Sequence, residues 1–294
     1  MDIQHLKYFL EVCKYESFSK AADHLFVTQP ILTRCIKSLE KEFGVTLIIR
    51  STKSFELTDS GKALQYYGQQ LVNQHQDIYR HIQDVKDAVV GEVHISSPGV
   101  LLDMYFPKIV TDFHKEYPDV RITVKECGSR HTERDVLDGI ADIGLVMLPS
   151  ENPQNLDIVP LVSDSVCVLV RNDHPFASVS QIHIHQLANE DIITYNPGTT
   201  LYHTFIKLCQ ENGFVPHISY QSLMPNFILD IISYGDCVGV LPAPVYHQFK
   251  SKNLVAIPLV PQFPWEIAMI TKKGRYLSHA AERFMKYTLE HLNK

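Results

Sequence analysis

The fold of the N-terminal region is decided by residues 17–58, SFSKAADHLFVTQPILTRCIKSLEKEFGVTLIIRSTKSFELT. Ser17 precedes a short helical pattern and is a candidate N-cap. Thr28 precedes a second helical pattern with Pro30 in its first turn, where the missing N–H removes no helical hydrogen bond. Gly44 can end that helix, and the segment after it indicates two short strands around a polar tip. Together these segments predict a helix-turn-helix followed by a β-hairpin wing.

Apolar periodicity extends this unit upstream and predicts its core. Four residues before the quoted stretch are spaced for one face of a helix: Leu6, Phe9, Leu10 and Cys13. Ala21 and Ala22 give the short helix a small, closely packing face. In the helix after Thr28, four side chains are expected to face inward: Ile31, Ile36, Leu39 and Phe43. Residues 1–58 therefore predict a small winged helix-turn-helix domain.

Residues 59–89 predict one long helix, capped by Thr58 or Asp59. Apolar residues recur in it at intervals of seven: Leu64, Leu71, Ile78 and Val85. A second seam position is only partly apolar, with Tyr67, His75 and Ile82. Thirty helical residues span about 45 Å, which is long for a small domain. We therefore favour a dimerising linker with a coiled-coil seam over an ordinary helix packed on its own domain.

From residue 90 to residue 294 strand-like and helix-like segments alternate, which predicts an α/β domain of parallel sheets with helices on both faces. Segments 156–162 and 165–171 are expected to be separate strands, and Pro107 is expected to kink a helix or delay its start. The pattern restarts near residue 163. We therefore expect two Rossmann-like lobes joined by crossing strands, with lobe I at about 90–162 and 265–294 and lobe II at about 163–264.

Composition excludes several classes of protein. The 294 residues carry a net charge of −6, which is unlike a uniformly basic protein that coats nucleic acid. Residues 28–53 nevertheless hold five basic and two acidic side chains. The sequence contains no run of 18 apolar residues, so no membrane-spanning helix is expected. The N-terminus does not resemble a signal peptide. Six scattered cysteines favour reduced thiols in the cytoplasm, and we expect no metal site and no cofactor.

The quoted stretch resembles the DNA-binding region of LysR-type transcriptional regulators. The resemblance rests on the Ala-Ala pair, Thr28-Gln29-Pro30, Leu39-Glu40, the Gly-Val-x-Leu step and the Leu-Thr-x-x-Gly segment that ends at Gly61. Looser matches follow at ADIGLVM, DHPFA and VGVLP. Ile48-Ile49-Arg50 replaces the family's usual Phe-x-Arg. The resemblance implies a homo-oligomer, often a tetramer, whose C-terminal region is similar to periplasmic solute-binding proteins.

A recognition helix presents its N-terminal residues to base edges in the major groove. Gln can pair with adenine and Arg with guanine, while Thr can contact a thymine methyl group or a phosphate. Basic residues further along the helix and on the wing are expected at the DNA backbone or the minor groove. The predicted DNA-binding residues are Ser17, Thr28, Gln29, Pro30, Thr33, Arg34, Lys37, Arg50 and Lys53.

Two segments, 96–100 and 196–200, each leave a strand and enter a helix, with hydroxyl groups and unblocked backbone N–H groups. Helix N-termini favour negative charge, so a small carboxylate between the lobes is the expected effector. No Arg lies in either segment. The predicted effector-binding residues are Ser96, Ser97, Gly99, Val100, Gly128, Ser129, Tyr195, Thr199, Thr200, Met224 and Phe227.

The sequence thus predicts a cytoplasmic, ligand-responsive regulator that reads an inverted repeat in double-stranded DNA as a homodimer or homotetramer. RNA polymerase is a candidate partner, and no membrane is involved. One alternative is a cytosolic solute-binding module without DNA activity, whose N-terminal helices make protein contacts. Another is an enzyme that uses the cleft, but the sequence offers no acid–base pair for it. Effector, target genes and the direction of regulation are not predicted.

Overall fold

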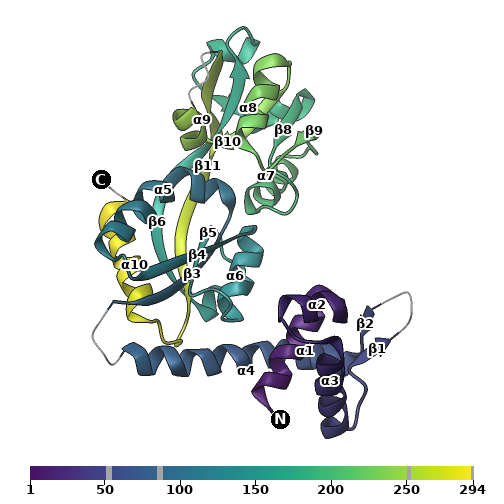
Figure 1. The fold of residues 1–294 in the computed structure, drawn as a ribbon. Coiled ribbons are helices and arrows are strands. Elements are labelled where there is room, and N and C mark those ends of the chain that lie inside the picture. The colour runs from purple at the N-terminus through teal and green to yellow at the C-terminus, as the bar shows by residue number, and fades with distance from the viewer. Residues whose placement is uncertain (51–54, 85–88, 250–252, 293–294) are drawn as a thin grey trace. The chain divides into compact units, whose positions relative to one another are not determined.

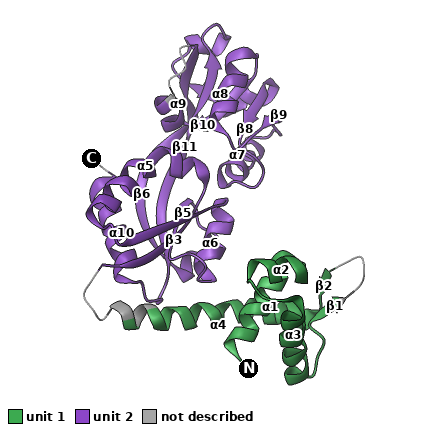
Figure 2. Cartoon of the chain, viewed as in Figure 1, with its two compact units in different colours: residues 1–86 green, residues 87–294 purple. Residues whose placement is uncertain are grey.

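The structure is a computed structural model that describes residues 1–50, 55–84, 89–249 and 253–292. The chain divides into two compact units, Met1–Lys86 and Asp87–Lys294 (Figure 2). The first unit contains α1 (Ile3–Tyr15), α2 (Phe18–His24), α3 (Gln29–Phe43), β1 (Ile48–Arg50), β2 (Phe55–Leu57) and α4 (Asp59–Asp84).

Local chemistry sets the ends of these elements. Asp2 and Ser17 cap α1 and α2 by accepting hydrogen bonds from the backbone N–H groups of Gln4 and Lys20, respectively. Gly44 ends α3 with φ of +67°, a conformation that disfavours residues with a Cβ atom. Strands β1 and β2 pair antiparallel as a hairpin. The predicted winged helix-turn-helix is therefore confirmed.

The buried face of α3 differs in part from the prediction. Ile36 and Leu39 are buried as expected, but Ile31 and Phe43 are 42% and 45% exposed. The face that packs on α1 and α2 instead consists of Leu32, Cys35, Ile36 and Leu39. Successive residues of a helix point about 100° apart, so predicting Ile31 rather than Leu32 as buried rotated the predicted apolar face away from the observed one.

Helix α4 begins against the wing through a close backbone approach. The Thr58 hydroxyl accepts a hydrogen bond from the Gly61 N–H at 2.9 Å and donates one to the Thr46 carbonyl oxygen at 2.7 Å. A Cβ atom at Gly61 would overlap the carbonyl oxygen of Leu47. Thr58 is thus the cap, and the glycine of the Leu-Thr-x-x-Gly segment is required by this contact.

Helix α4 has 26 residues and is therefore about 39 Å long at 1.5 Å per residue. Some of its apolar residues are buried in its own domain and others are exposed. Val72 is buried, and Leu64 packs on the core of the N-terminal unit. The next seam positions, Leu71 and Ile78, are exposed, whereas Val85 lies outside the described residues. The first position of the predicted seam, Leu64, therefore packs on the helix's own domain, whereas Leu71 and Ile78 do not.

The second unit is built on a nine-stranded sheet with the order β4-β3-β5-β11-β6-β10-β8-β9, and β7 pairs with β11. Its strands are β3 (Gly91–Ser97), β4 (Val120–Glu126), β5 (Ile143–Met147), β6 (Leu156–Arg171), β7 (Ile182–His183), β8 (Asp191–Thr194), β9 (His217–Gln221), β10 (Val238–Pro242) and β11 (Leu254–Lys272). Its α-helices are α5 (Gly99–Glu116), α6 (Ser129–Leu137), α7 (Thr200–Glu211), α8 (Pro225–Tyr234), α9 (Ala243–Phe249) and α10 (His279–His291).

Two long antiparallel strands join the two ends of this unit. Figure 1 shows β6 and β11 running between one lobe with β3, β4, β5, α5, α6 and α10 and another with β8, β9, β10, α7, α8 and α9. Helix α10 closes the first lobe by packing Phe284 edge-on against Phe113 of α5, with ring centroids 5.0 Å apart. The two-lobed architecture is confirmed, while the predicted lobe limits stay a prediction.

Two expectations for this unit are wrong. The sheet is mixed rather than parallel, because β11 pairs antiparallel with both β5 and β6. Segments 156–162 and 165–171 form one continuous strand, in which a register shift at Leu161, between the residues paired with Ile267 and Ala268, breaks the alternation without a turn. Of the two effects expected of Pro107, only the delayed start is excluded, because α5 starts at Gly99 and continues through Pro107. Among the described residues, no helix is long and apolar enough to cross a membrane.

Candidate nucleic-acid interface and effector cavity

Helix α3 presents one polar face to solvent. Thr28, Gln29, Pro30, Arg34 and Lys37 are exposed and Thr33 is half-buried. A shallow, open depression on this face is lined by Gln29, Pro30, Thr33, Arg34 and Lys37. Because the buried stripe of α3 holds the helix on α1 and α2, this polar face is fixed in orientation. Six of the nine predicted DNA-binding residues thus lie together at the start of one helix.

The charges of this face are uncompensated. Within the described residues, Arg34 and Lys37 form no ion pair. Thr28 is the N-cap of α3, but its hydroxyl makes no capping hydrogen bond. A free guanidinium, a free ammonium and a free hydroxyl at a helix N-terminus are suited to phosphates and base edges.

The remaining predicted residues have other positions. Ser17 is half-buried and caps α2. The side chain of Arg50 and the whole of Lys53 lie outside the described residues. One neighbour that sequence reasoning missed is Ser19, whose hydroxyl lies 3.5 Å from Gln29 Oε1. Ser19 is the second residue of α2, and no local signal in the sequence shows that the start of α2 lies beside the start of α3.

Glu40 ties the wing to α3. Its Oε1 accepts hydrogen bonds from the backbone N–H groups of Leu47 and Ile48, at 2.9 and 3.4 Å. The Leu39-Glu40 pair thereby joins the buried stripe of α3 to the first strand of the hairpin. The wing and the polar face of α3 consequently move as one body.

The second unit contains a cavity of about 450 Å³ where four helices begin. Helices α5, α6, α7 and α8 each contribute residues of their first turn, and β5, β11 and the ends of β4 and β8 contribute the rest. The lining residues are Pro98, Gly99, Val100, Leu101, Asp103, Glu126, Cys127, Gly128, Ser129, Met147, Tyr195, Thr199, Thr200, Leu201, Leu223, Met224, Pro225, Asn226 and Trp265. This volume is in the range of small-molecule sites.

The structure brings most of the predicted effector residues to this cavity. Those that line it are Gly99, Val100, Gly128, Ser129, Tyr195, Thr199, Thr200 and Met224. Ser96 and Ser97 do not, because both are buried and their hydroxyls donate to Asp135 Oδ2 at 2.8 Å and to the Pro98 carbonyl oxygen at 3.0 Å. Phe227 is exposed outside the lining.

Sequence reasoning missed several walls of the cavity. Trp265 is the chain's single tryptophan and is 2% exposed on β11. Met147 ends β5, and Pro225 opens α8. A proline at the first position of a predicted helix was a signal for another helix start. Trp265 gave no such signal, because only the fold brings β11 beside residues so distant in sequence.

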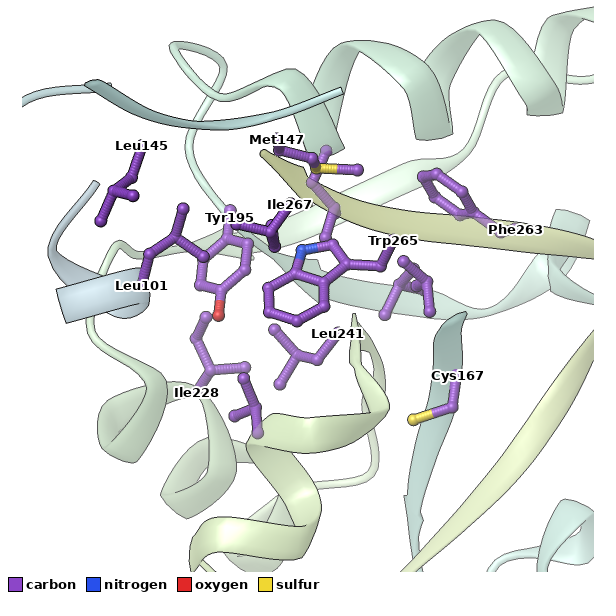
Figure 3. Close-up of a cluster of buried hydrophobic side chains, with 14 of the residues drawn as sticks. Leu101, Leu145, Met147, Cys167, Tyr195, Ile228, Leu241, Phe263, Trp265 and Ile267 are labelled. Atoms are coloured by element: carbon purple, nitrogen blue, oxygen red, sulfur yellow. The ribbon is translucent and has the colours of Figure 1, made fainter. Parts of the chain in front are cut away.

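Free backbone donors converge on the cavity. Among the described residues, the N–H groups of the first two residues of α5, α6 and α7 have no acceptor. Tyr195 is 4% exposed and its hydroxyl also has no hydrogen-bond partner. Burial raises the pKa of Tyr195, so the hydroxyl stays protonated and remains a donor at neutral pH. Figure 3 shows this hydroxyl directed toward Ile228 of α8, with the indole of Trp265 near the phenol ring.

The two lobes approach each other closely at the rim of the cavity. A Cβ atom on Gly128, which precedes α6, would lie 3.1 Å from the carbonyl oxygen of Gly198, which precedes α7. The missing Cβ atom of Gly128 therefore permits a close backbone contact between segments of different lobes, whereas a Cβ atom on Gly198 would meet no neighbour. Relative movement of the lobes would open or close this contact and change the cavity.

Family comparisons agree with this architecture. A family model described as "LysR substrate binding domain" matches residues 86–293, and one described as "Bacterial regulatory helix-turn-helix protein, lysR family" matches residues 3–62. The chain belongs to the LysR family. It is a transcriptional regulator with a helix-turn-helix and an effector-binding domain, and it is not an enzyme.

Relatives and solved structures cover the whole LysR-type chain. It is 33% identical over 293 residues to the uncharacterized HTH-type transcriptional regulator YwbI of Bacillus subtilis, covering 99% of this chain and 97% of the relative. Full-length OxyR from Pseudomonas aeruginosa has a TM-score of 0.73 at 21% identity, covering 99% and 97% of the two chains. The LysR family regulator CbnR has a TM-score of 0.69 at 18% identity, with 100% of both chains covered. At these identities the two structures show the shared fold.

The cysteines of this LysR-type regulator are poorly placed for peroxide chemistry. Burial raises the pKa of Cys13, Cys167 and Cys209 to about 12. Cys127 lines the effector cavity, and its pKa is also raised, first by burial. The pKa values of Cys35 and Cys237 are raised by burial as well. Since the thiolate is the nucleophile, raised pKa values leave little reactive sulfur at neutral pH.

We therefore expect hydrogen peroxide to leave DNA binding by this regulator unchanged. The measurement is a gel shift after treatment of the protein with peroxide at pH 7, with intact-mass spectrometry of the same sample. A mass matching six reduced cysteines and an unaltered affinity are predicted. A reversible change of affinity that disappears in Cys127→Ser would contradict this reading.

Proposed function

We propose that this LysR-family regulator binds a small carboxylate in the cavity and thereby alters how a homo-oligomer sits on an inverted-repeat operator. The observation that carries the proposal is the convergence of free N–H groups from three helix starts on one cavity. Helix N-termini and unpaired N–H groups together favour an anion.

The DNA-reading half of the proposal rests on α3. Its exposed face offers Gln29, Thr33 and Arg34 for base edges, and Lys37 for the DNA backbone. Phosphate contacts release counterions, so affinity is expected to fall steeply with salt. The site of action in this proposal is the cytoplasm, where a bacterial chromosome lies.

The oligomer in this proposal is formed first through α4. Tyr67, Leu71, Ile78 and Ile82 are spaced to share one side of the helix and are all exposed in the single chain. An apolar stripe of this kind on a long helix is suited to a second copy of the same helix. Twofold pairing would set two recognition helices on half-sites separated by one helical turn or a multiple of it, about 34 Å per turn.

Coupling between cavity and operator is proposed to run through lobe closure. The strands β6 and β11 are shared by both lobes, and the contact between Gly128 and Gly198 crosses between them. A ligand that favours one lobe arrangement would shift the assembly by a coupling free energy of about 1–3 kcal/mol, which is typical of such systems. RNA polymerase stays a candidate partner in this scheme.

The carboxylate is tested by thermal shift with small organic acids and their uncharged amides at equal concentration. We expect some acids to raise the melting temperature and their amides to have no effect, because only the acids supply a full negative charge to the helix ends. A gel shift on upstream DNA with and without the stabilising acid then tests the coupling. Stabilisation by uncharged compounds alone would overturn the carboxylate. Absence of any shift of upstream DNA would favour the solute-binding module without DNA activity.

A further inference from the structure

Two carboxylates face the same cavity as the helix starts. Glu126 is the last residue of β4, and Asp103 lies one turn into α5. Both residues are exposed and line the cavity, and no lysine or arginine is among its lining residues. A ligand with only negative charge would therefore meet two like charges and no basic side chain.

Neither carboxylate is neutralised by the protein. Glu126 and Asp103 take part in no ion pair within the described parts of the chain. The bases nearest to Glu126 in sequence are engaged elsewhere, because Lys125 pairs with Asp135 at 2.8 Å and Arg130 pairs with Glu151 at 2.7 Å. The base nearest to Asp103, Lys108, pairs with Asp112 at 2.6 Å. The two negative charges are thus available to a ligand.

The cavity is polarised as a result. Glu126 Oε2 lies 3.3 Å from the position of a Cβ atom on Gly99, so this carboxylate stands over the start of α5. It offsets the positive end of that helix, about half an elementary charge. The starts of α6 and α7 have no such carboxylate among the lining residues, and they keep their free N–H groups. One side of the cavity therefore favours a cation and the other side an anion.

Two buried aromatic residues, Tyr195 and Trp265, also line the cavity. The Tyr195 hydroxyl is buried without a hydrogen-bond partner. Trp265 lies in the cluster of buried side chains shown in Figure 3, and it is among the residues that line the cavity. An indole face attracts an ammonium group.

We propose that the effector is a small zwitterion of amino acid size, with its ammonium group held by Glu126 and Asp103 and its carboxylate at the starts of α6 and α7. The inference rests on the proposed function, because it keeps the carboxylate and adds a second charged group. A cavity of about 450 Å³ has room for one such molecule. Glu126 is the residue that selects the amino group.

The test is titration calorimetry of the full-length protein with matched probes. Each of the common L-amino acids is compared with its α-hydroxy acid, which lacks the ammonium group, and with its amide, which lacks the carboxylate. We expect at least one amino acid to bind about tenfold more tightly than either of its analogues. Glu126→Gln should remove this preference for the amino acid over its hydroxy acid, and Asp103→Asn should weaken it.

Glu211→Gln is the matched control. Glu211 lies at the end of α7, outside the lining of the cavity, and should leave all affinities unchanged. Because Glu126 is an exposed strand-end residue, Glu126→Gln should keep the wild-type melting temperature in the absence of ligand.

The outcomes separate the two proposals. Equal or tighter binding of the hydroxy acids overturns the zwitterion and leaves the carboxylate standing. Tighter binding of the amides overturns both the zwitterion and the carboxylate. Binding of no probe at all contradicts both, and an unchanged amino acid preference in Glu126→Gln removes the role assigned to that residue.

Discussion

Arg34→Ala is expected to remove sequence-selective DNA binding while leaving the protein folded. Arg34 is exposed in the second turn of α3 and forms no ion pair within the described residues, so alanine disturbs no internal contact. A bidentate contact from arginine to guanine contributes about 1–3 kcal/mol of discrimination. The ratio of affinities for upstream DNA and for random DNA should fall by about 10- to 100-fold, measured by gel shift with competitor DNA.

Lys14→Ala is the control for this variant. It removes one positive charge from the same unit, at the exposed end of α1. It should weaken binding to both DNAs slightly and equally, through general electrostatics alone. If Arg34→Ala retains the wild-type selectivity, α3 does not read bases through this side chain and the recognition assignment is wrong.

Ile78→Asp is expected to separate the oligomer formed through α4. Ile78 is 57% exposed in the single chain, so aspartate costs the isolated fold little. In a seam between two copies, it would instead place two carboxylates in an apolar contact, where unpaired charge is strongly unfavourable. Light scattering should show a lower molar mass, and affinity for upstream DNA should fall at least about 100-fold, because two half-sites are no longer linked.

Gln76→Asp adds the same charge to α4 at an exposed position away from the seam and should leave the mass unchanged. Leu71→Asp should reproduce the effect of Ile78→Asp, because Leu71 lies one heptad before Ile78 on the same side of α4. An intact oligomer in both seam variants would mean that α4 serves only its own domain.

Local chemistry made the N-terminal unit predictable. Ser17, Thr28 and Gly44 mark helix ends through caps and conformation, which depend on a few neighbouring residues. The inward face of α3 was less certain, because Ile31 and Leu32 are both apolar and periodicity alone does not choose between them. The position of Gly61 followed from resemblance, and only the structure supplied its reason, the approach to Leu47.

The second unit was less predictable because its neighbours are set by topology. Residues 254–272 carry no sequence signal for their antiparallel pairing with residues 156–171. The alternation of strand-like and helix-like segments therefore predicted a parallel sheet. Helix starts were visible as Gly, Ser, Thr and Pro, and most of them do converge on the cavity. Ser96 and Ser97 were misplaced, since a strand's last residues can point into the core as well as toward a ligand. Glu126 and Trp265 have no local motif.

Methylation interference on bound DNA tests most directly whether α3 reads base edges in the major groove. We expect methylation of guanine N7 to block binding in two clusters, centred about 10 base pairs or a multiple apart. In each cluster, methylation of one guanine should no longer reduce DNA binding by the Arg34→Ala variant. Interference confined to minor-groove adenine positions, with every guanine N7 tolerated, would contradict this expectation.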